Sequence, residues 1–177
     1  LLDARINSFE PFKDVYGFVA GDDVLRFTAM MIGEVVDELG TISDFIGHAG
    51  GDNFIIITTE GNADAIKTRL KERFDNEVQT HYNFMDRQQG FVQAPSADGT
   101  TIKVPFMTMS VGIVSPSMQS FADIREITEL AAEARRQDAP GGQHVQQLVI
   151  NRDVLDSARR AERKHSRPED RDQRHPK

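Results

Sequence analysis

Two short apolar runs joined by a Gly-Gly turn constrain the fold of this chain most strongly. The runs cover Asp44–Ala49 and Phe54–Thr58, and the sequence GGDN at 50–53 separates them. Because glycine adopts positive φ at no steric cost, a Gly-Gly pair between β-rich segments is typical of a tight hairpin. The sequence therefore predicts two antiparallel strands with Gly50 and Gly51 at their tip.

Helical periodicity predicts the elements that pack around this hairpin. Apolar residues recur at four-residue spacing from Val24 to Leu39, which indicates an amphipathic helix. We expect Asp22 and Asp23 at its positive end and Gly40 as its left-handed C-cap. Further helices are expected over residues 8–16, from an Asn62 cap to Val78, and from a Ser120–Asp123 capping box to Ala134.

The remaining segments complete a mixed fold. Strands are predicted over residues 1–6, 106–114 and 145–150, and residues 79–104 are expected to form an irregular excursion with room for a short hairpin. This order of elements favours an α+β (mixed α/β) class, with a central β-sheet flanked by helices. We expect one domain over residues 1–156. Residues 157–177 are basic and almost without apolar side chains, which predicts a frayed or disordered tail.

Composition narrows the classes of function. The formal net charge of -7 over 177 residues argues against a general binder of nucleic-acid polymers. No apolar run approaches the roughly 18 residues of a membrane span. The absence of Cys removes thiol nucleophiles and cysteine zinc sites. We therefore expect a cytoplasmic protein, and the Leu1-Leu2 opening without Met suggests a fragment of a longer polypeptide.

The sequence segments on either side of the Gly-Gly turn indicate which family of proteins it belongs to. YGFVAGDDVL stands at 16–25, DFIGH at 44–48 leads into the turn, and MTMSVGI follows at 107–113. In this order they resemble the GGDEF family of diguanylate cyclase domains, from residue 1 to about 150. The first helix of such a domain would lie before Leu1. The excursion at 79–104 and the Gly17-Phe18 pair are similar to a divergent branch often fused to receiver domains, as in response regulators.

The resemblance implies both a fold and an activity. The fold would be related to nucleotide cyclases and polymerase palm domains. Two domains, each holding one GTP, would face each other and form cyclic di-GMP. Two Mg²⁺ or Mn²⁺ ions held by carboxylates would neutralise the phosphates and activate a ribose 3′-hydroxyl. The partners implied are GTP or cyclic di-GMP, an upstream receiver or sensor domain, and a second copy in a homodimer.

Carried over one at a time, the catalytic and metal positions are only partly kept. The catalytic turn falls on Gly50, Gly51, Asp52 and Asn53. Asp52 keeps the hairpin metal carboxylate, whereas Asn53 is neutral where the family is acidic. Ile6 would offer its backbone carbonyl to the metal, but the first-strand metal Asp falls on Arg5. Asp3 would supply a carboxylate there only after a two-residue shift of the register.

The nucleotide-binding positions are mixed in the same way. Those carried over are Phe9, Lys13, Asp22, Arg135 and Arg136. At the family's guanine-binding Asp position this chain also has an Asp, Asp22. Lys13 stands where the family has a guanine-binding Asn, and Glu10 stands where it has a Lys beside the phosphates. At the inhibitory product site Asp44 is kept, but its partner Arg falls on Thr41.

Three functions remain open at this point. The first is a catalytically impaired family member that acts by guanine-nucleotide binding, dimerisation or partner contact. The second is an active diguanylate cyclase with unconventional ligands, which would need Mg²⁺ or Mn²⁺. The third is a structural module that never meets a nucleotide. In the register used here, Arg5 should point toward Asp52 and form an ion pair within about 4 Å.

Overall fold

A computed structural model describes residues 1–118, 120–121 and 123–141. The predicted last strand at 145–150 and the basic tail at 157–177 lie outside these residues. All the elements below belong to one compact unit, Leu1–Pro140. None of the helices in the described ranges is both long and apolar enough to cross a membrane.

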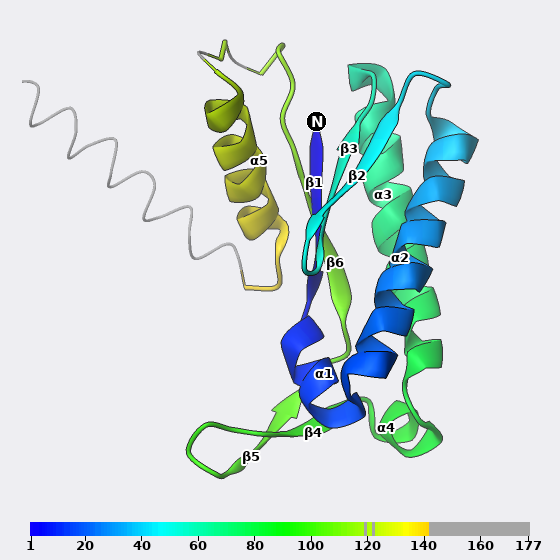
Figure 1. Ribbon diagram of the computed structural model, residues 1–177, viewed down its shortest axis with the longest axis vertical. Coiled ribbons are helices and arrows are strands. Elements are labelled where there is room, and N and C mark those ends of the chain that lie inside the picture. Colours follow the sequence, from blue (N-terminus) through cyan, green and yellow to red (C-terminus); the bar gives the residue numbers. More distant parts are fainter. Residues whose placement is uncertain (119, 122, 142–177) are drawn as a thin grey trace, which may run out of the picture. The chain divides into compact units, whose positions relative to one another are not determined.

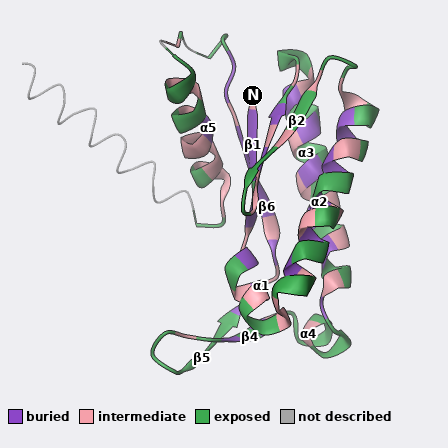
Figure 2. Ribbon diagram, viewed as in Figure 1, coloured by how far each residue is buried: buried purple, intermediate pink, exposed green. Residues whose placement is uncertain are grey.

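The centre of the fold is a four-stranded antiparallel sheet in the order β2-β3-β1-β6 (Figure 1). The strands are β1 (Leu2–Asn7), β2 (Phe45–Gly50), β3 (Asn53–Ile57) and β6 (Thr108–Ile113). β1 lies between β3 and β6 and is largely buried, whereas β2 forms an exposed edge (Figure 2). This arrangement confirms the predicted α+β class and the predicted hairpin.

The side chains of β1 alternate between two different environments. Leu2, Ala4 and Ile6 belong to the hydrophobic core. That core also contains the buried faces of α2 (Phe18–Leu39) and α3 (Glu60–Glu77). The intervening polar residues face the opposite side, where α5 (Ile124–Asp138) packs. The two helical layers therefore lie on opposite faces of the sheet (Figure 1).

Gly112 explains how closely α5 approaches the sheet. A Cβ at this position would lie 2.2 Å from the Ala131 carbonyl oxygen and 2.3 Å from the Arg135 amide nitrogen. Both are backbone atoms, which cannot move without displacing the helix. Only glycine on β6 leaves room for α5 here.

The excursion after α3 is more ordered than the sequence predicted. It contains a 3₁₀ turn (Val78–His81), α4 (Phe84–Gln89) and a separate hairpin of β4 (Val92–Pro95) and β5 (Thr101–Val104). The Tyr16 hydroxyl ties this excursion to α1 (Phe9–Tyr16) by accepting from the Asn83 amide at 3.2 Å and donating to Asp86. The Tyr82 ring reinforces this link by edge-on contacts with the Phe12 and Tyr16 rings, with ring centres 5.2 and 5.6 Å apart. No local sequence pattern predicted these contacts.

The long helix ends at Leu39 with Gly40 as its C-cap, as predicted, but its predicted start and the predicted left-handed conformation of Gly40 were wrong. α2 begins at Phe18, because Gly17 at φ +87° ends α1 and turns the chain directly into the next helix. Asp22 and Asp23 therefore lie in the second turn instead of at the positive end. Gly40 is extended at φ −94°, ψ −154°, and is not a left-handed cap. A Cβ on Gly40 would lie 2.3 Å from an Asp44 carboxylate oxygen, so glycine makes room for that side chain.

Two predicted helix caps were also wrong. α3 begins at Glu60 after Thr59, and Asn62 lies inside its first turn. The serine hydroxyls of Ser115 and Ser117 donate to Glu60, which anchors the helix start one turn earlier than expected. At α5 the cap is Asp123 alone, whose carboxylate accepts from the amides of residues 125 and 126.

Candidate functional site

The hairpin tip lies against the C-terminal end of β1. Gly50 has φ +111° and Gly51 has φ +56°, which confirms that both turn glycines need positive φ. The His48 ring bonds to the Gly51 carbonyl oxygen at 2.8 Å. The Ile6 amide donates to the Asp52 carbonyl oxygen at 3.2 Å, so the backbone of Ile6 faces the tip.

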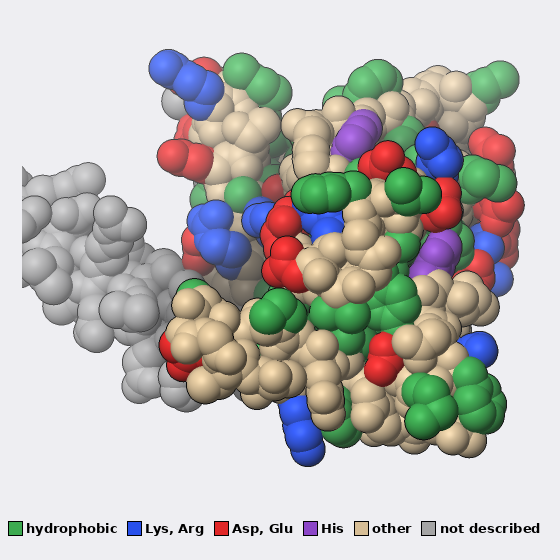
Figure 3. All heavy atoms as spheres, turned by 60° about the horizontal axis from the view of Figure 1, so that its bottom comes forward, with side chains coloured by type: hydrophobic (Ala, Val, Ile, Leu, Met, Phe, Trp, Pro, Cys, Tyr) green, Lys and Arg blue, Asp and Glu red, His purple; other side chains and the backbone are tan. Residues whose placement is uncertain are grey.

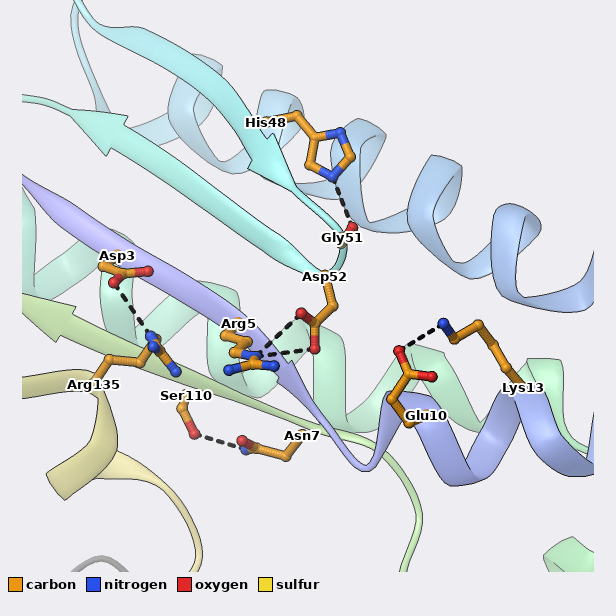
Figure 4. Close-up of polar contacts among 10 residues, drawn as sticks. All are labelled: Asp3, Arg5, Asn7, Glu10, Lys13, His48, Gly51, Asp52, Ser110 and Arg135. Carbon is orange, nitrogen blue, oxygen red and sulfur yellow. Dashed lines mark hydrogen bonds and ion pairs between the residues drawn. The ribbon is translucent and has the colours of Figure 1, made fainter. Parts of the chain in front are cut away.

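Arg5 and Asp52 form the ion pair that the sequence predicted (Figure 4). The Arg5 Nε donates to both carboxylate oxygens of Asp52, each at 3.1 Å. The pairing of Arg5 with Asn53 in the β1–β3 register brings the two side chains together. The Asp52 side chain is 15% exposed and that of Arg5 is 49% exposed, so the guanidinium reaches solvent.

A second guanidinium lies on the same face of β1. Arg135 extends from α5, and its Nε lies 3.3 Å from a carboxylate oxygen of Asp3. This pair is buried, with side chains 12% and 8% exposed. Next to it, the Asn7 amide donates to Thr108 at 2.9 Å and to Ser110 at 2.7 Å.

These groups line a cleft of about 270 Å³. Its walls are Arg5, residues 6–11, Asp52 and Arg135. The cleft thus joins the end of β1, the start of α1, the hairpin tip and the last turn of α5. Sequence reasoning placed five of these groups in the site, namely Arg5, Ile6, Phe9, Asp52 and Arg135. It considered Asp3 only as a metal carboxylate after a shift of register and Asn7 only at an acidic position of the family, and not as polar partners within the cleft wall. Their signal was the polar alternation of Asp3, Arg5 and Asn7 in an otherwise apolar strand.

Lys13 and Phe9 meet beside Gly21. The Lys13 ammonium lies 2.7 Å from Glu10 and 4.8 Å from the centre of the Phe9 ring. A Cβ on Gly21 would lie 2.7 Å from the Lys13 methylene chain, so that chain covers the glycine. Asp22, the next residue, is exposed on α2. Lys13, Phe9 and the Gly21–Asp22 segment are therefore brought together, with the lysine stem filling the space between them.

Asp44 and Arg136 do not belong to this cleft. Asp44 accepts hydrogen bonds from the Thr58 hydroxyl at 2.6 Å and from the Thr41 hydroxyl at 2.7 Å. These bonds, Thr58 first, hold the pKa of its carboxyl below the ordinary value. Arg136 pairs with Glu133 on its own helix, Nε to carboxylate oxygen at 3.0 Å.

Charges around the site are balanced and not gathered into one patch. Figure 3 shows acidic and basic side chains interspersed on the face that it turns forward. Arg5, Lys13 and Arg135 each have an acidic partner within 4 Å. Across the described residues, no three His, Asp or Glu side chains converge in a way that could hold a metal ion.

A family model covers most of the chain. The family described as "Diguanylate cyclase, GGDEF domain" matches residues 1–144. The signaling protein YkoW from Bacillus subtilis is 32% identical over 102 residues, which cover 54% of this chain and 12% of YkoW. The chain thus corresponds to a small part of that relative's length.

A solved structure from Pseudomonas aeruginosa has the same fold, and a second solved structure matches less closely. The GGDEF domain of TpbB (YfiN) from Pseudomonas aeruginosa superposes with a TM-score of 0.53 at 21% identity, covering 79% of this chain and 72% of that one. The GGDEF domain of DgcB from Caulobacter crescentus, solved in complex with c-di-GMP, gives 0.47 at 23% identity, covering 77% and 69%. With the family match over residues 1–144, the chain belongs to the GGDEF domain family of diguanylate cyclases.

Proposed function

We propose that this chain is a catalytically impaired GGDEF domain, which acts in cyclic di-GMP signalling by binding a guanine nucleotide or a partner and not by making cyclic di-GMP. The observation that carries the proposal is the Arg5–Asp52 ion pair at 3.1 Å. The resemblance puts a metal-binding Asp at the position of Arg5, so a cation stands where a ligand is expected.

The electrostatic energy at the position of Arg5 supports the loss of metal-dependent catalysis. Two unit charges about 4 Å apart interact with about 4 kcal/mol at an effective dielectric of 20. Replacing a carboxylate by a guanidinium converts one such attraction for a divalent ion into a repulsion. Asp52 already has the Arg5 guanidinium as its countercharge. We therefore judge that the residues present do not fit the Mg²⁺ or Mn²⁺ pair that an active member of the family uses.

Incubation with GTP and either Mg²⁺ or Mn²⁺, followed by mass spectrometry of the products, tests the proposal. We expect no cyclic di-GMP from the chain, while an active member of the family assayed in parallel should produce it. The Arg5→Asp variant places two carboxylates at the cleft and should bind Mn²⁺ more tightly than the wild type. Arg125→Asp, on an exposed side chain of α5, is the matched charge control. Formation of cyclic di-GMP by the wild type would establish the active-enzyme alternative.

Calorimetric titration separates binding from a purely structural role. A domain that acts by binding a guanine nucleotide should release or absorb heat with GTP, GDP or cyclic di-GMP, whereas a structural module should give none. An upstream receiver or sensor domain, a homodimer and a cytoplasmic location are further parts of the proposal. The full-length sequence, light scattering and cell fractionation test them in turn.

A further inference from the structure

A groove of about 380 Å³ lies between α2 and α3, which pack side by side (Figure 1). Its volume falls within the range of about 300–1,000 Å³ that is typical of small-molecule sites. One wall is a stripe of α2 whose residues are one to four positions apart: Asp23, Arg26, Phe27, Met30, Met31 and Glu34. The other wall runs from α3 into the 3₁₀ turn at four-residue spacing: Arg73, Glu77 and His81. None of these residues lines the cleft at the hairpin tip.

Part of the groove is apolar and aromatic. The Phe27 and His81 rings lie together, with 5.1 Å between their centres. Met31 is buried, whereas Met30 is 68% exposed. Methionine has a flexible, polarizable thioether that adapts to ligands of different shape and makes favourable contacts with aromatic rings. This part of the groove is therefore suited to an apolar or aromatic body.

The charged side chains of the groove leave one negative charge in excess. The Arg73 Nε donates to Glu77 at 2.7 Å, and its Nη2 donates to Glu34 at 2.8 Å. Arg26 pairs with Asp23 at 3.0 Å. Three carboxylates therefore face two guanidiniums, and both guanidiniums already have carboxylate partners.

His81 adds an unused hydrogen-bonding group to this lining. Across the described residues, neither ring nitrogen of His81 has a hydrogen-bond partner. Burial lowers the pKa of His81 below 6.5, and the nearby Asp23 carboxylate opposes only part of that shift. The imidazole is therefore neutral at neutral pH, where its unprotonated nitrogen accepts a hydrogen bond.

We propose that the groove between α2 and α3 binds a small organic cation that carries an ammonium or amidinium group on an apolar or aromatic body. The carboxylates attract the charge, the Phe27 ring takes up the cation or its body, and His81 accepts a hydrogen bond from it. An anion would meet the excess negative charge and no guanidinium without a partner. The groove shares no residue with the cleft, so this inference does not depend on nucleotide binding.

NMR of the whole chain with ¹³C-labelled methionine methyl groups tests the inference, with benzylamine as the probe. Benzyl alcohol and benzoate carry the same ring with a neutral and an anionic group. Benzylamine should shift the Met30 and Met31 signals with a dissociation constant on the order of 1 mM. The Met118 signal should not move, because Met118 lines a different and more apolar groove. Benzyl alcohol and benzoate should bind at least about threefold more weakly.

Two glutamates of α2 give a matched pair of variants. Glu34→Gln removes a carboxylate from the groove while Glu77 still holds Arg73, so it should weaken benzylamine binding by at least about threefold. Glu38→Gln is the control, because Glu38 is a half-exposed residue one turn further along α2 that pairs with Arg69 and does not line the groove. That variant should bind benzylamine as the wild type does.

Acid should release the probe. Protonation of His81 removes the acceptor and cancels the excess negative charge, so binding should weaken from about pH 7.5 to about pH 5.5. The other ionisable groups of the groove keep their charges over this range: Asp23, Arg26, Glu34, Arg73 and Glu77. His81→Gln keeps an acceptor that does not titrate, so its affinity should change little with pH.

Several outcomes would overturn the inference. They are benzoate binding as tightly as benzylamine, equal affinity of Glu34→Gln and the wild type, and affinity that rises as pH falls. A shift of Met118 without Met30 or Met31, or no shift of these two at about 10 mM benzylamine, would do the same. None of these results bears on whether the chain makes cyclic di-GMP or binds a nucleotide.

Discussion

Asp3 and Arg135 form an ion pair that is almost fully buried between β1 and α5, with 3.3 Å between the carboxylate oxygen and Nε. Removing one member of a buried pair leaves an uncompensated charge, which costs about 3–5 kcal/mol. Arg135→Met should therefore lower the free energy of unfolding by about that amount in urea titrations. Arg136→Met, which breaks a half-exposed pair with Glu133, should cost about 1 kcal/mol or less. Equal effects of the two substitutions would contradict the burial of the Asp3 pair.

Gly112 should tolerate no side chain. Its Cβ would meet two backbone atoms of α5 at 2.2 and 2.3 Å, so Gly112→Ala forces the helix away from the sheet. We expect a loss of about 1–3 kcal/mol in the free energy of unfolding. Gly33→Ala is the matched control, because Gly33 lies in α2 with nothing within 4 Å of the added methyl group. That change should stabilise the protein by up to about 1 kcal/mol. An undiminished stability of Gly112→Ala would mean that α5 packs further from β6.

The hairpin and the alternation along β1 were predictable because both are local. Turn glycines and two-residue periodicity lie within a few residues of each other, and the structure places Gly50 and Gly51 at positive φ as expected. The Arg5–Asp52 pair was predictable for a different reason. Once β1 and β3 are paired in the family's register, residues at the strand end and the hairpin tip must meet.

Long-range polar contacts were not predictable in this way. Carboxylates from two helices accept hydrogen bonds from backbone amides on the outer edge of β6. The Met109 amide donates to Asp75 at 3.3 Å, and the Val111 amide donates to Asp138 at 2.9 Å. These partners lie 34 and 27 residues apart in the sequence, and each Asp looks like an ordinary exposed helical residue. The Asp3–Arg135 pair was missed for the same reason.

The ionised Asp138 carboxylate should make the free energy of unfolding decrease at acidic pH. Burial alone would raise the pKa of its carboxyl, but hydrogen bonds from Lys67, Lys71 and the Val111 amide outweigh it and lower the pKa below 3.8. A lowered folded pKa contributes stability above the unfolded value, which is lost as pH falls through the folded pKa. Asp138→Asn should therefore destabilise the protein at neutral pH, and the difference should shrink below pH 3.8.

Asp75 provides the contrasting case on the same strand edge. Burial raises the pKa of its carboxyl above 3.8. The free energy of unfolding therefore falls as pH rises from 3.8 through the raised folded pKa, where the buried carboxyl must ionise. The free energy of unfolding of Asp75→Asn, relative to that of the wild type, should therefore increase as pH rises. Urea unfolding of both variants from neutral pH to below 3.8 measures the two slopes, and parallel slopes would contradict the opposite pKa shifts.

Cyclic di-GMP should bind weakly at the position of the family's inhibitory site. An Arg would offer a bidentate grip on guanine and phosphate, but Thr41 stands there and uses its hydroxyl on Asp44 at 2.7 Å. Asp44 is also held by Thr58 and repels an anion. Titration with cyclic di-GMP should show no micromolar binding. Micromolar binding that disappears in Asp44→Ala would show that this site works without the Arg.

Lys13 should make nucleotide recognition insensitive to the base. Lysine offers only donors, whereas asparagine offers a donor and an acceptor to a base edge. The Lys13 chain also covers Gly21, and its ammonium is held 2.7 Å from Glu10. Thermal shifts of the wild type with GTP and ATP should therefore be equal. Lys13→Asn uncovers Gly21 next to Asp22 and should enlarge the GTP shift alone. Lys103→Asn, an exposed lysine that stacks on Phe91, should leave both shifts as they are. A larger GTP shift in the wild type would mean that a base displaces the Lys13 chain despite its pairing with Glu10.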